Sequence, residues 1–289
     1  MHDVIEIMLN EYQCKSVNDY INAVKEIIQK ITLLGLWRAK FFENVAFYDG
    51  TALRIFYQLD RFSEDLDFSL LNADKKFKLE KYNEAIISEL KAFGFEIEIS
   101  SKIRDAASNI EAAHIKTQTK QQLIAISAPS YLSERIHSQQ KINVKMEVDI
   151  DPPMGFKQEA KMLLNPIPFE VNVYQISDLF STKIHALLCR SWGSRVKGRD
   201  WFDLVWYISR NIPVCLSHLE SRLRKNQVWT NNHSLTENDV QNLLLEKINK
   251  TDFELAKKDV LPFIKDNSRL ALWSQSFFHS LVEKILYSS

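Results

Sequence analysis

Apolar residues recur at helical spacing near the start of the chain. Between residues 17 and 41 they form a stripe flanked by charged residues, at Val17, Ile21, Val24, Ile27, Ile28 and Ile31. Such a stripe predicts an amphipathic helix with one face toward a core. The apolar run 45–48, a glycine at position 50 and the apolar segment 52–59 then predict a strand, a tight turn and a short helix.

Alternating patterns predict strands. In the segment 65–70, Asp65 and Asp67 alternate with three apolar residues, so both carboxylates project from one face of a strand. The segment 141–151 alternates in the same way and has a second acidic face, which carries Lys145, Glu147, Asp149 and Asp151. Further strands are predicted at 95–99 and 169–174, and a charged helix at 76–93 that ends at Gly94.

The pattern changes to helical after residue 174. Helices are predicted near 177–190, 199–209, 216–225, 237–249 and 268–286. We therefore predict an α+β fold with two domains, a mixed sheet with helices over 1–174 and a mainly α-helical domain over 175–289.

The composition narrows the class of protein. With 45% hydrophobic and 26% charged residues, the chain of 289 residues is typical of globular proteins. Its 37 basic and 37 acidic residues cancel, which argues against general coating of DNA and restricts any nucleic-acid contact to a local basic patch.

The cysteines and the apolar segments indicate the compartment. Cys14, Cys189 and Cys215 form no CxxC pair, which favours free thiols over a disulfide framework or a zinc site. The N-terminus has no signal-peptide pattern, and no stretch approaches the ~18 apolar residues of a membrane span. We expect a cytoplasmic protein without a membrane partner.

The first chemical feature combines a glycine turn with paired acids. Gly50 and Thr51 stand at a strand-to-helix turn, where backbone amides and a hydroxyl can contact a phosphate. Asp65 and Asp67 follow, and two carboxylates can hold Mg²⁺ together with substrate phosphates. A Gly-Thr pair alone is more often only a turn, and an Asp-x-Asp pair alone is more often a solvated strand edge. The prediction therefore depends on the order and spacing of the two features in the chain.

The second feature is Lys183, which lies in line with Leu179 and Leu187 on the apolar stripe of a predicted helix. An ammonium group there needs a partner, and a nucleotide phosphate is one such partner. The alternatives are a snorkelling lysine or a structural ion pair. If Lys183 faces a phosphate, its replacement by Met should abolish phosphoryl transfer and cost little stability.

The third feature is the segment 197–204, a glycine turn followed by a helix with Asp200 and Asp203 on one face. Asp200 in the first turn is compatible with capping. Asp203 lies among aromatic and aliphatic residues and needs a cationic partner such as Arg199, Lys183 or a metal.

Together these segments resemble the AbiEii/AbiGii nucleotidyltransferase toxins, over about residues 40–210. The matching segments are Asp49-Gly50-Thr51-Ala52-Leu53, Arg61-Phe62-Ser63-Glu64-Asp65-Leu66-Asp67-Phe68, Asp178-Leu179 to Lys183 with Ala186-Leu187, and Lys197-Gly198-Arg199-Asp200-Trp201-Phe202-Asp203-Leu204. The family usually has Gly-Gly-Thr or Gly-Gly-Ser where this chain has Asp49-Gly50-Thr51, which places an additional acid near the phosphates.

The resemblance implies a polymerase-β-like nucleotidyltransferase with a helical C-terminal domain. Asp65 and Asp67 would bind Mg²⁺ or Mn²⁺, Gly50 and Thr51 would contact the triphosphate of an NTP, and Lys183 with Asp200 or Asp203 would complete the site. Arg199 is a further candidate for nucleotide binding. Relatives act as toxins of toxin–antitoxin pairs, and some add nucleotides to the acceptor end of tRNA, so the resemblance also implies an antitoxin as partner.

A third metal-binding carboxylate is expected from the strand predicted at 141–151. Asp149 is the first candidate because it lies in the middle of the acidic face, and Glu147 and Asp151 share that face.

The acceptor is predicted less directly. Arg190, Arg195, Lys197 and Arg199, with Trp192 and Trp201, could contact RNA phosphates and stack on a base. One alternative is a binding or regulatory protein whose catalysis has decayed, which Asp49 favours. The other is transfer to a protein hydroxyl or a small molecule such as an aminoglycoside. Labelled nucleotides offered to RNA and protein pools distinguish these alternatives.

Overall fold

The structure is a computed structural model that describes residues 2–102, 108–119, 140–190 and 196–288. The chain divides into two compact units, each interrupted in sequence. Unit 1 consists of Met1–Tyr57, Phe62–Pro152 and Glu159–Val173. Unit 2 consists of Gln58–Arg61, Pro153–Gln158 and Tyr174–Ser289.

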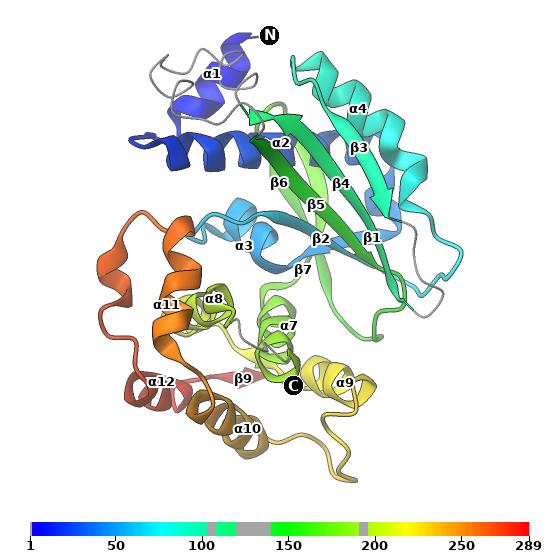
Figure 1. Cartoon of the computed structure of the whole chain (residues 1–289). Helices are drawn as coiled ribbons and strands as arrows, with labels where there is room; N and C mark the ends of the chain where they lie inside the picture. Colours follow the sequence, from blue (N-terminus) through cyan, green and yellow to red (C-terminus); the bar gives the residue numbers. More distant parts are fainter. Residues whose placement is uncertain (1, 103–107, 120–139, 191–195, 289) are drawn as a thin grey trace. The chain divides into compact units, whose positions relative to one another are not determined.

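A seven-stranded mixed sheet forms the centre of unit 1 within the described residues, with strand order β3-β4-β5-β2-β1-β7-β6 (Figure 1). The strands are β1 Val45–Tyr48, β2 Asp65–Leu70, β3 Glu98–Lys102, β4 Ile110–Gln118, β5 Lys141–Asp149, β6 Gln158–Leu163 and β7 Phe169–Tyr174. β2 is central: it runs antiparallel to β1 and parallel to β5. The predicted α+β class with a mixed sheet is therefore confirmed.

The helices of unit 1 are α1 His2–Asn10, α2 Val17–Arg38, α3 Asp49–Tyr57 and α4 Asn83–Ala92, with short 3-10 turns η1 Phe41–Glu43 and η2 Leu79–Tyr82. Ser16 and Asp19 form a capping box at the start of α2. α2 packs closely on α4 at Gly35, because a Cβ atom there would lie 3.1 Å from the carbonyl oxygen of Ala85. The core contains an aromatic cluster in which Phe41 meets Phe68 edge to face at 5.0 Å.

Unit 2 is mainly helical. Its helices are α7 Ile176–Cys189, α8 Gly198–Ser209, α9 Leu216–Lys225, α10 Glu237–Asn249, α11 Phe253–Val260 and α12 Gln275–Val282, with 3-10 turns η3 Leu261–Phe263 and η4 Asn267–Leu270. Two short parallel strands, β8 Val214–Cys215 and β9 Tyr287–Ser288, complete it.

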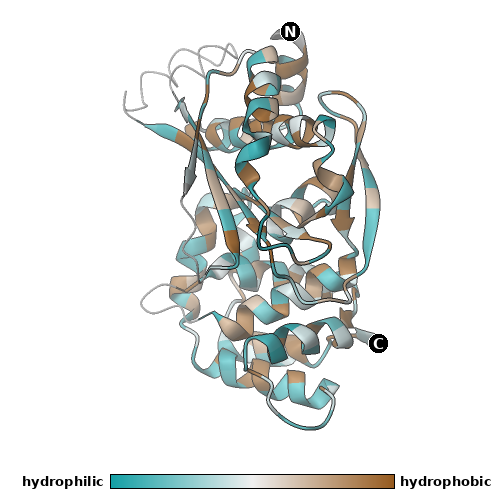
Figure 2. Ribbon diagram, turned by 90° about the vertical axis from the view of Figure 1, so that its right-hand side faces the viewer, coloured by the Kyte–Doolittle hydropathy of each residue, from teal (hydrophilic) through white to brown (hydrophobic). Residues whose placement is uncertain are grey.

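Figure 2 shows apolar and polar positions interspersed along the helices of the chain, as amphipathic packing requires. No described helix is long and apolar enough to cross a membrane.

Most predicted elements are present, with some wrong bounds. The strand predicted at 95–99 is instead Glu98–Lys102. The residues before it complete the C-terminal end of α4: Gly94 has a φ of 88°, and the N–H of Phe95 donates a hydrogen bond to the Leu90 carbonyl. Phe95 therefore cannot begin the strand. The helix predicted at 268–286 is shorter. Ser274 starts a new helix there, since its Oγ accepts a hydrogen bond from the amide of Phe277 at 3.2 Å.

Other elements had no clear pattern. β4 buries Glu111, Ala113, Ile115 and Thr117, of which only two are apolar, so its alternation is weak. β6 is an edge strand of the sheet, and Leu163 is its one buried residue, so it has no apolar face. The short helices α1 and α11 were also missed.

Candidate functional site

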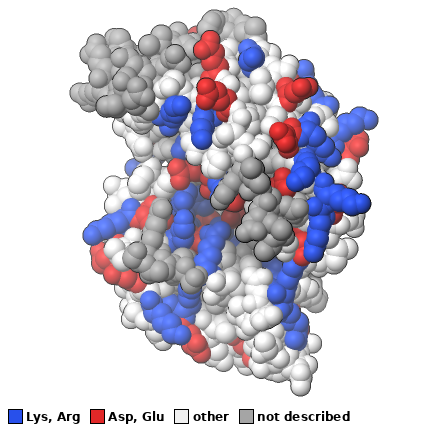
Figure 3. All heavy atoms as spheres, turned by 45° about the vertical axis from the view of Figure 1, so that its right-hand side comes forward, with Lys and Arg blue, Asp and Glu red and all other residues white. Residues whose placement is uncertain are grey.

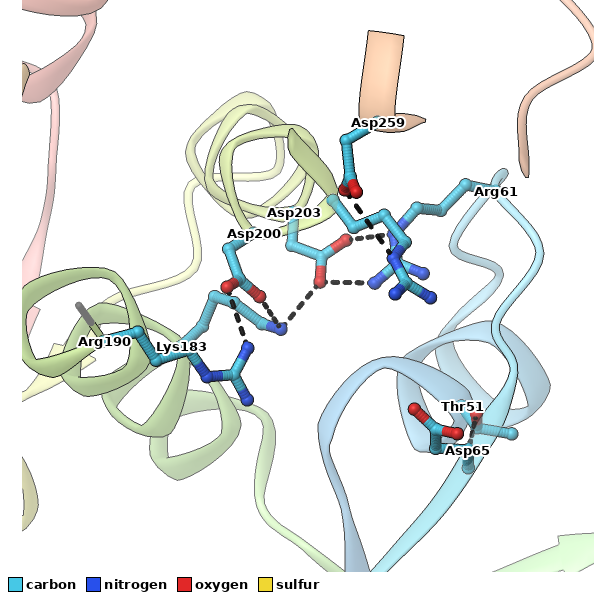
Figure 4. A network of polar contacts seen from close by, with 9 residues as sticks. Thr51, Arg61, Asp65, Lys183, Arg190, Asp200, Asp203 and Asp259 are labelled. Atoms are coloured by element: carbon cyan, nitrogen blue, oxygen red, sulfur yellow. Dashed lines mark hydrogen bonds and ion pairs between the residues drawn. The ribbon is translucent and has the colours of Figure 1, made fainter. Parts of the chain in front are cut away.

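The strand, turn and helix predicted around Gly50 are present in unit 1. β1 ends at Tyr48 and α3 begins at Asp49. Thr51 is buried, and its hydroxyl donates a hydrogen bond to the main-chain carbonyl of Asp65 (Figure 4). Tyr48 is also level with Asp67 in the antiparallel β1–β2 pair. The Gly50-Thr51 turn is thus held against the strand that carries both aspartates.

Asp49 has a left-handed backbone conformation, with φ 65°. Glycine adopts this region without steric cost, and aspartate is among the few other residues that tolerate it. The geometry therefore favours glycine at this position. In this chain the same turn carries a half-buried carboxylate.

The residues just before Asp65 anchor β2 to helix α2. Phe62 is buried, and the carbonyl of Ser63 accepts a hydrogen bond from Gln29 at 3.1 Å. Glu64 forms an ion pair with Lys25 at 3.0 Å. Each residue of this segment therefore has a physical role, which is to fix the position at which β2 begins.

The register of β2 and β5 determines which acids are neighbours. Asp65 and Asp67 are half-buried on the same face of β2. In the parallel pairing, Asp67 is level with Glu147, and Asp149 is level with Ser69. Glu147 is therefore the acid beside Asp67, and Asp149 lies one pleat further along. The assignment of Asp149 as a metal ligand stays a prediction.

The described residues contain no group of three or more His, Cys, Asp or Glu side chains arranged to hold a metal ion. Glu147 forms an ion pair with Lys145 at 2.7 Å, on side chains about one third exposed. Unit 1 therefore offers two carboxylates on one strand face with a third on the neighbouring strand, and no closed cage of ligands among its described residues.

Lys183, Asp200 and Asp203 come together in unit 2, as the predicted stripe on α7 and the acidic face of α8 imply. The Lys183 Nζ lies 3.0 Å from Asp200 Oδ1 and 3.0 Å from Asp203 Oδ2. All three side chains are buried, with at most 5% of their surface exposed. The alternative of an ion-paired lysine is therefore realised in this structure.

Two arginines extend this network (Figure 4). Arg61 donates two hydrogen bonds to Asp203, from Nε at 2.7 Å and from Nη2 at 2.6 Å. Arg190 donates one to Asp200 Oδ2 at 2.9 Å. The Arg61 side chain is only 3% exposed, whereas that of Arg190 is 46% exposed. Arg61 has no local pattern that marks it as a partner of Asp203, because the two are 142 residues apart in sequence.

Each buried cation of this network has a carboxylate partner. Lys183 contacts Asp200 and Asp203, and Arg61 contacts Asp203. Buried charges need close partners, since deleting one partner of a buried pair costs on the order of 3–5 kcal/mol. The network is therefore a structural element of unit 2 that holds the Lys183 ammonium group in a fixed position.

Arg199 has other contacts. Its Nε lies 4.0 Å from Asp259 Oδ2, and its guanidinium lies 4.4 Å from the centre of the Phe263 ring. Asp203 is paired instead with Lys183 and Arg61. Gly198, just before Arg199, allows α8 to approach α11 closely, because a Cβ atom there would lie 1.8 Å from the Ala256 carbonyl oxygen.

The basic cluster proposed for RNA is partly described. Arg195 and Trp192 lie outside the described residues, and Lys197 is half-buried. The expectation that Trp201 could stack on a base is wrong, because this side chain is fully buried against Phe253 and Phe278. On the face in Figure 3, Lys and Arg are interspersed with Asp and Glu, in agreement with the zero net charge.

A second polar cluster in unit 2 is structural. Asp178 is buried at the start of α7, and its Oδ2 accepts a hydrogen bond from the Lys157 amide at 2.5 Å. Burial raises the pKa of this carboxyl. The contact explains Asp178 in the segment before Lys183: it joins α7 to residues 153–158.

His218 on α9 is a strongly perturbed imidazole of unit 2. Burial, followed by the nearby Arg222, lowers the pKa of His218 to about 3. Its Nε2 accepts a hydrogen bond from Arg222 Nε at 3.0 Å, which requires the neutral ring. Burial also lowers the pKa of His185 to about 4. Both imidazoles are therefore neutral at physiological pH.

Comparisons with known proteins identify a family by its sequence model and show similar folds among solved structures. Residues 31–279 match the family model described as nucleotidyl transferase AbiEii toxin of type IV toxin–antitoxin systems. Among solved structures, MenT4, a nucleotidyltransferase toxin from Mycobacterium tuberculosis H37Rv, is similar at 12% identity and a TM-score of 0.50, with 98% of this chain and 89% of that chain covered. JHP933 from Helicobacter pylori is similar at 18% identity and a TM-score of 0.45, with 91% and 94% covered. No curated protein sequence matches significantly.

Proposed function

The chain belongs to the AbiEii family of nucleotidyltransferase toxins, and we propose that it moves a nucleoside monophosphate from an NTP onto an RNA acceptor, with Asp65 and Asp67 holding a divalent cation. The observation that carries this proposal is the placement of both carboxylates on one face of β2, with the Thr51 hydroxyl bonded to the Asp65 carbonyl.

The carboxylate pair fits Mg²⁺ or Mn²⁺. Mg²⁺ prefers oxygen ligands and is usually bound through one or two carboxylates plus substrate phosphates, so a closed cage of protein ligands is not needed. When bound, the metal would neutralise negative charge that develops on the transferring phosphoryl group. Asp65 and Asp67 would hold it, and Glu147 or Asp149 on β5 is the proposed third carboxylate.

The turn at the start of α3 is the proposed phosphate contact. Backbone amides at a helix start are donors for an anion, and the helix dipole favours negative charge there. Gly50 lets the backbone come close to a ligand. Thr51 donates its hydroxyl hydrogen to Asp65, so we assign it mainly to positioning β2 relative to the turn.

Lys183 is proposed to supply positive charge to the reaction. Asp200 and Asp203 contact its ammonium group at 3.0 Å each and fix its position. A preorganised cation stabilises charge in phosphoryl transfer more effectively than a mobile one, because no reorganisation is needed during the reaction. Arg199 remains a proposed nucleotide contact.

RNA, and tRNA in particular, is the proposed acceptor, and a cognate antitoxin is the proposed partner. Both are proposed from the toxin family, and the arginines of unit 2 additionally favour RNA as the acceptor. Because NTP and tRNA are intracellular substrates, the proposed reaction belongs in the cytoplasm.

The test offers each of the four α-³²P-labelled NTPs to the purified chain with total RNA, tRNA or a protein extract. We expect label in RNA, only with Mg²⁺ or Mn²⁺ present. If label appears in protein and none appears in RNA, the acceptor is a protein. Nucleotide binding without transfer to any pool would favour a regulatory protein instead.

A further inference from the structure

Unit 1 contains a cavity whose lining includes neither of the paired aspartates of β2. It has a volume of about 530 Å³ and lies where the C-terminal end of α2 and η1 meet β6 and β7. This volume is within the range of ligand sites, roughly 300–1,000 Å³. The lining residues are Trp37, Arg38, Lys40, Phe42, Glu43, Ala160, Glu170 and Asn172, all of them in unit 1.

The aromatic part of the lining is open to a ligand. Trp37 is 39% exposed, although tryptophan is a residue that proteins bury extensively. Its ring is held in place by Phe169, with the two ring centroids 5.9 Å apart. Among aromatic rings, the face of an indole attracts a cation most strongly. Trp37 therefore offers an exposed and fixed ring surface that favours a cationic ligand.

The charges of the lining leave one acid without a partner. Arg38 forms an ion pair with the buried Glu89 at 3.3 Å, and Lys40 lies 3.9 Å from Glu43. Glu170 is exposed on β7 and has no ion pair within the described parts of the chain. Its carboxylate therefore gives the lining a negative charge that a ligand can neutralise.

The end of α2 adds to this preference. α2 ends at Arg38, and residues of its last turn line the cavity. The negative end of the helix dipole is therefore at the cavity, where positive charge is stabilised. A guanidinium group matches both the ring and the acid, because it stacks on an aromatic face and pairs with a carboxylate through parallel N–H groups.

A free strand edge runs beside the cavity. β6 is the last strand in the order of the sheet, so one side of its main chain has no partner strand among the described residues. Ala160 of β6 is exposed and lines the cavity. Met162 is on the same face, because residues two apart in a strand share a face, and it is 52% exposed. Free strand edges pair with extended peptides, whose alternate side chains enter neighbouring pockets.

From these features we propose that unit 1 binds an extended, arginine-bearing segment of a partner protein. The segment pairs with the free edge of β6, and one of its arginines lies in the cavity, against Trp37 and paired with Glu170. The interaction does not depend on the proposed transfer reaction, because the cavity includes neither Asp65 nor Asp67.

The test measures binding of the fluorescein-labelled, C-terminally amidated peptide TVRVRVT to the whole chain by anisotropy, without NTP or metal. Its alternating sequence favours an extended conformation and places both arginines on one face. Glu170→Gln removes the unpaired acid, and Trp37→Leu removes the aromatic ring but keeps an apolar side chain. Glu98→Gln is the matched control, because Glu98 is an exposed acid on β3, at the opposite edge of the sheet. Thermal melts establish that each variant is folded.

We expect saturable binding to wild type and at least about fivefold weaker binding by Glu170→Gln and by Trp37→Leu, as for loss of one charge-assisted or cation–π contact. The control should change binding less than about twofold. Absence of saturable binding to wild type up to about 1 mM peptide would overturn the proposal. So would unchanged binding by Glu170→Gln, or equal weakening by Glu98→Gln, which would indicate general electrostatic attraction.

The sign of the effect at Lys40 separates a site for cations from a site for anions. Lys40→Gln removes a positive charge from the lining, so it should leave peptide binding unchanged or strengthen it up to about threefold. Clearly weaker binding by this variant would contradict recognition of a cation. Binding of a fluorescein-labelled octaadenylate RNA that is lost in Trp37→Leu would assign the cavity to RNA. Either result would overturn the proposal.

Two further peptides identify what is recognised. Replacement of both arginines by citrulline keeps the shape but removes the charge, and should weaken binding at least about tenfold. N-methylation of all valine and arginine nitrogens removes the main-chain donors, and should weaken binding by a similar factor of about ten. Equal binding by the citrulline peptide would overturn the assignment to arginine, and equal binding by the N-methylated peptide would overturn the pairing with β6.

Discussion

Arg61 and Asp203 form a bidentate pair in the interior of unit 2, with nitrogen–oxygen distances of 2.7 and 2.6 Å and at most 3% of either side chain exposed. Asp203 also lies 3.0 Å from Lys183. Asp203 thus contacts two buried cations, whereas Asp200 contacts the buried Lys183 and the half-exposed Arg190. This difference gives the two aspartates of α8 different structural roles.

Asp203→Asn should destabilise the protein more than Asp200→Asn. The amide introduced at position 203 would direct N–H groups at a guanidinium that has no access to water, at a cost of about 3–5 kcal/mol. The substitution at position 200 would release Arg190, which is 46% exposed and can be hydrated, so the loss should be nearer ~1–2 kcal/mol. Urea denaturation of both variants measures the difference. Equal losses would show that the two aspartates are equivalent.

Sequence patterns predicted the elements with strong periodicity. β2 was located because Leu66 and Phe68 alternate with two acids, and α7 because Leu179 and Leu187 share a stripe. The partner of Asp203 was not predictable, because Arg61 reaches it through tertiary packing alone. The same applies to the register that sets Glu147 beside Asp67.

A cavity of unit 2 that Trp206 and Trp273 both line was not predicted for a related reason. Trp206 lies on the amphipathic helix α8, and Trp273 follows a short apolar run at residues 270–272, so neither local pattern indicates that the two residues are neighbours. Conversely, Trp201 was assigned to RNA from its neighbourhood in sequence, although burial excludes it. Local sequence patterns indicate which residues are apolar. They do not indicate which other residues these contact, because that depends on the tertiary packing of unit 2.

Lys183→Met should lower both stability and transfer. The apolar stripe alone predicts little loss of stability, but the two ion pairs predict a loss of about 1–3 kcal/mol. This loss of stability stays moderate because Asp203 is still paired with Arg61 and Asp200 is still paired with Arg190. Transfer, measured well below the melting temperature, should fall ~100-fold or more. A variant that melts earlier yet transfers at the wild-type rate would limit Lys183 to a structural role.

Asp49 allows charge and backbone strain to be separated. Asp49→Asn removes the carboxylate but tolerates the φ of 65°, Asp49→Gly removes both charge and strain, and Asp49→Ala restores the steric cost of about 1 kcal/mol. Glycine should raise the melting temperature and alanine should lower it. We expect the Asn and Gly variants to bind NTP more tightly than wild type in calorimetry. Unchanged affinity in both variants would show that this acid does not face the phosphates.

His218 should make stability depend on pH. Its folded-state pKa of about 3 is below the ordinary value of 6.5, so the unfolded chain binds the proton more readily. Stability is therefore full above about pH 6.5 and declines as pH falls toward 3. His218→Gln, which still accepts from Arg222, should flatten the decline between about pH 6.5 and 4.5. His279→Gln is the control, and an unchanged slope in His218→Gln would assign the decline to other groups.

Asp65 and Asp67 are proposed to hold the metal on which transfer depends. The rate of transfer from α-³²P-labelled NTP to RNA is compared between wild type, Asp65→Asn, Asp67→Asn and Glu98→Gln, with Mg²⁺ or with chelator. Glu98 is an exposed acid on β3 of the same sheet and is the matched control. We expect both Asn variants to fold and to lose at least about 100-fold in rate, Glu98→Gln to match wild type, and chelator to abolish transfer. Transfer by both the Asp65→Asn and the Asp67→Asn variant at the wild-type rate would show that these carboxylates do not hold a catalytic metal.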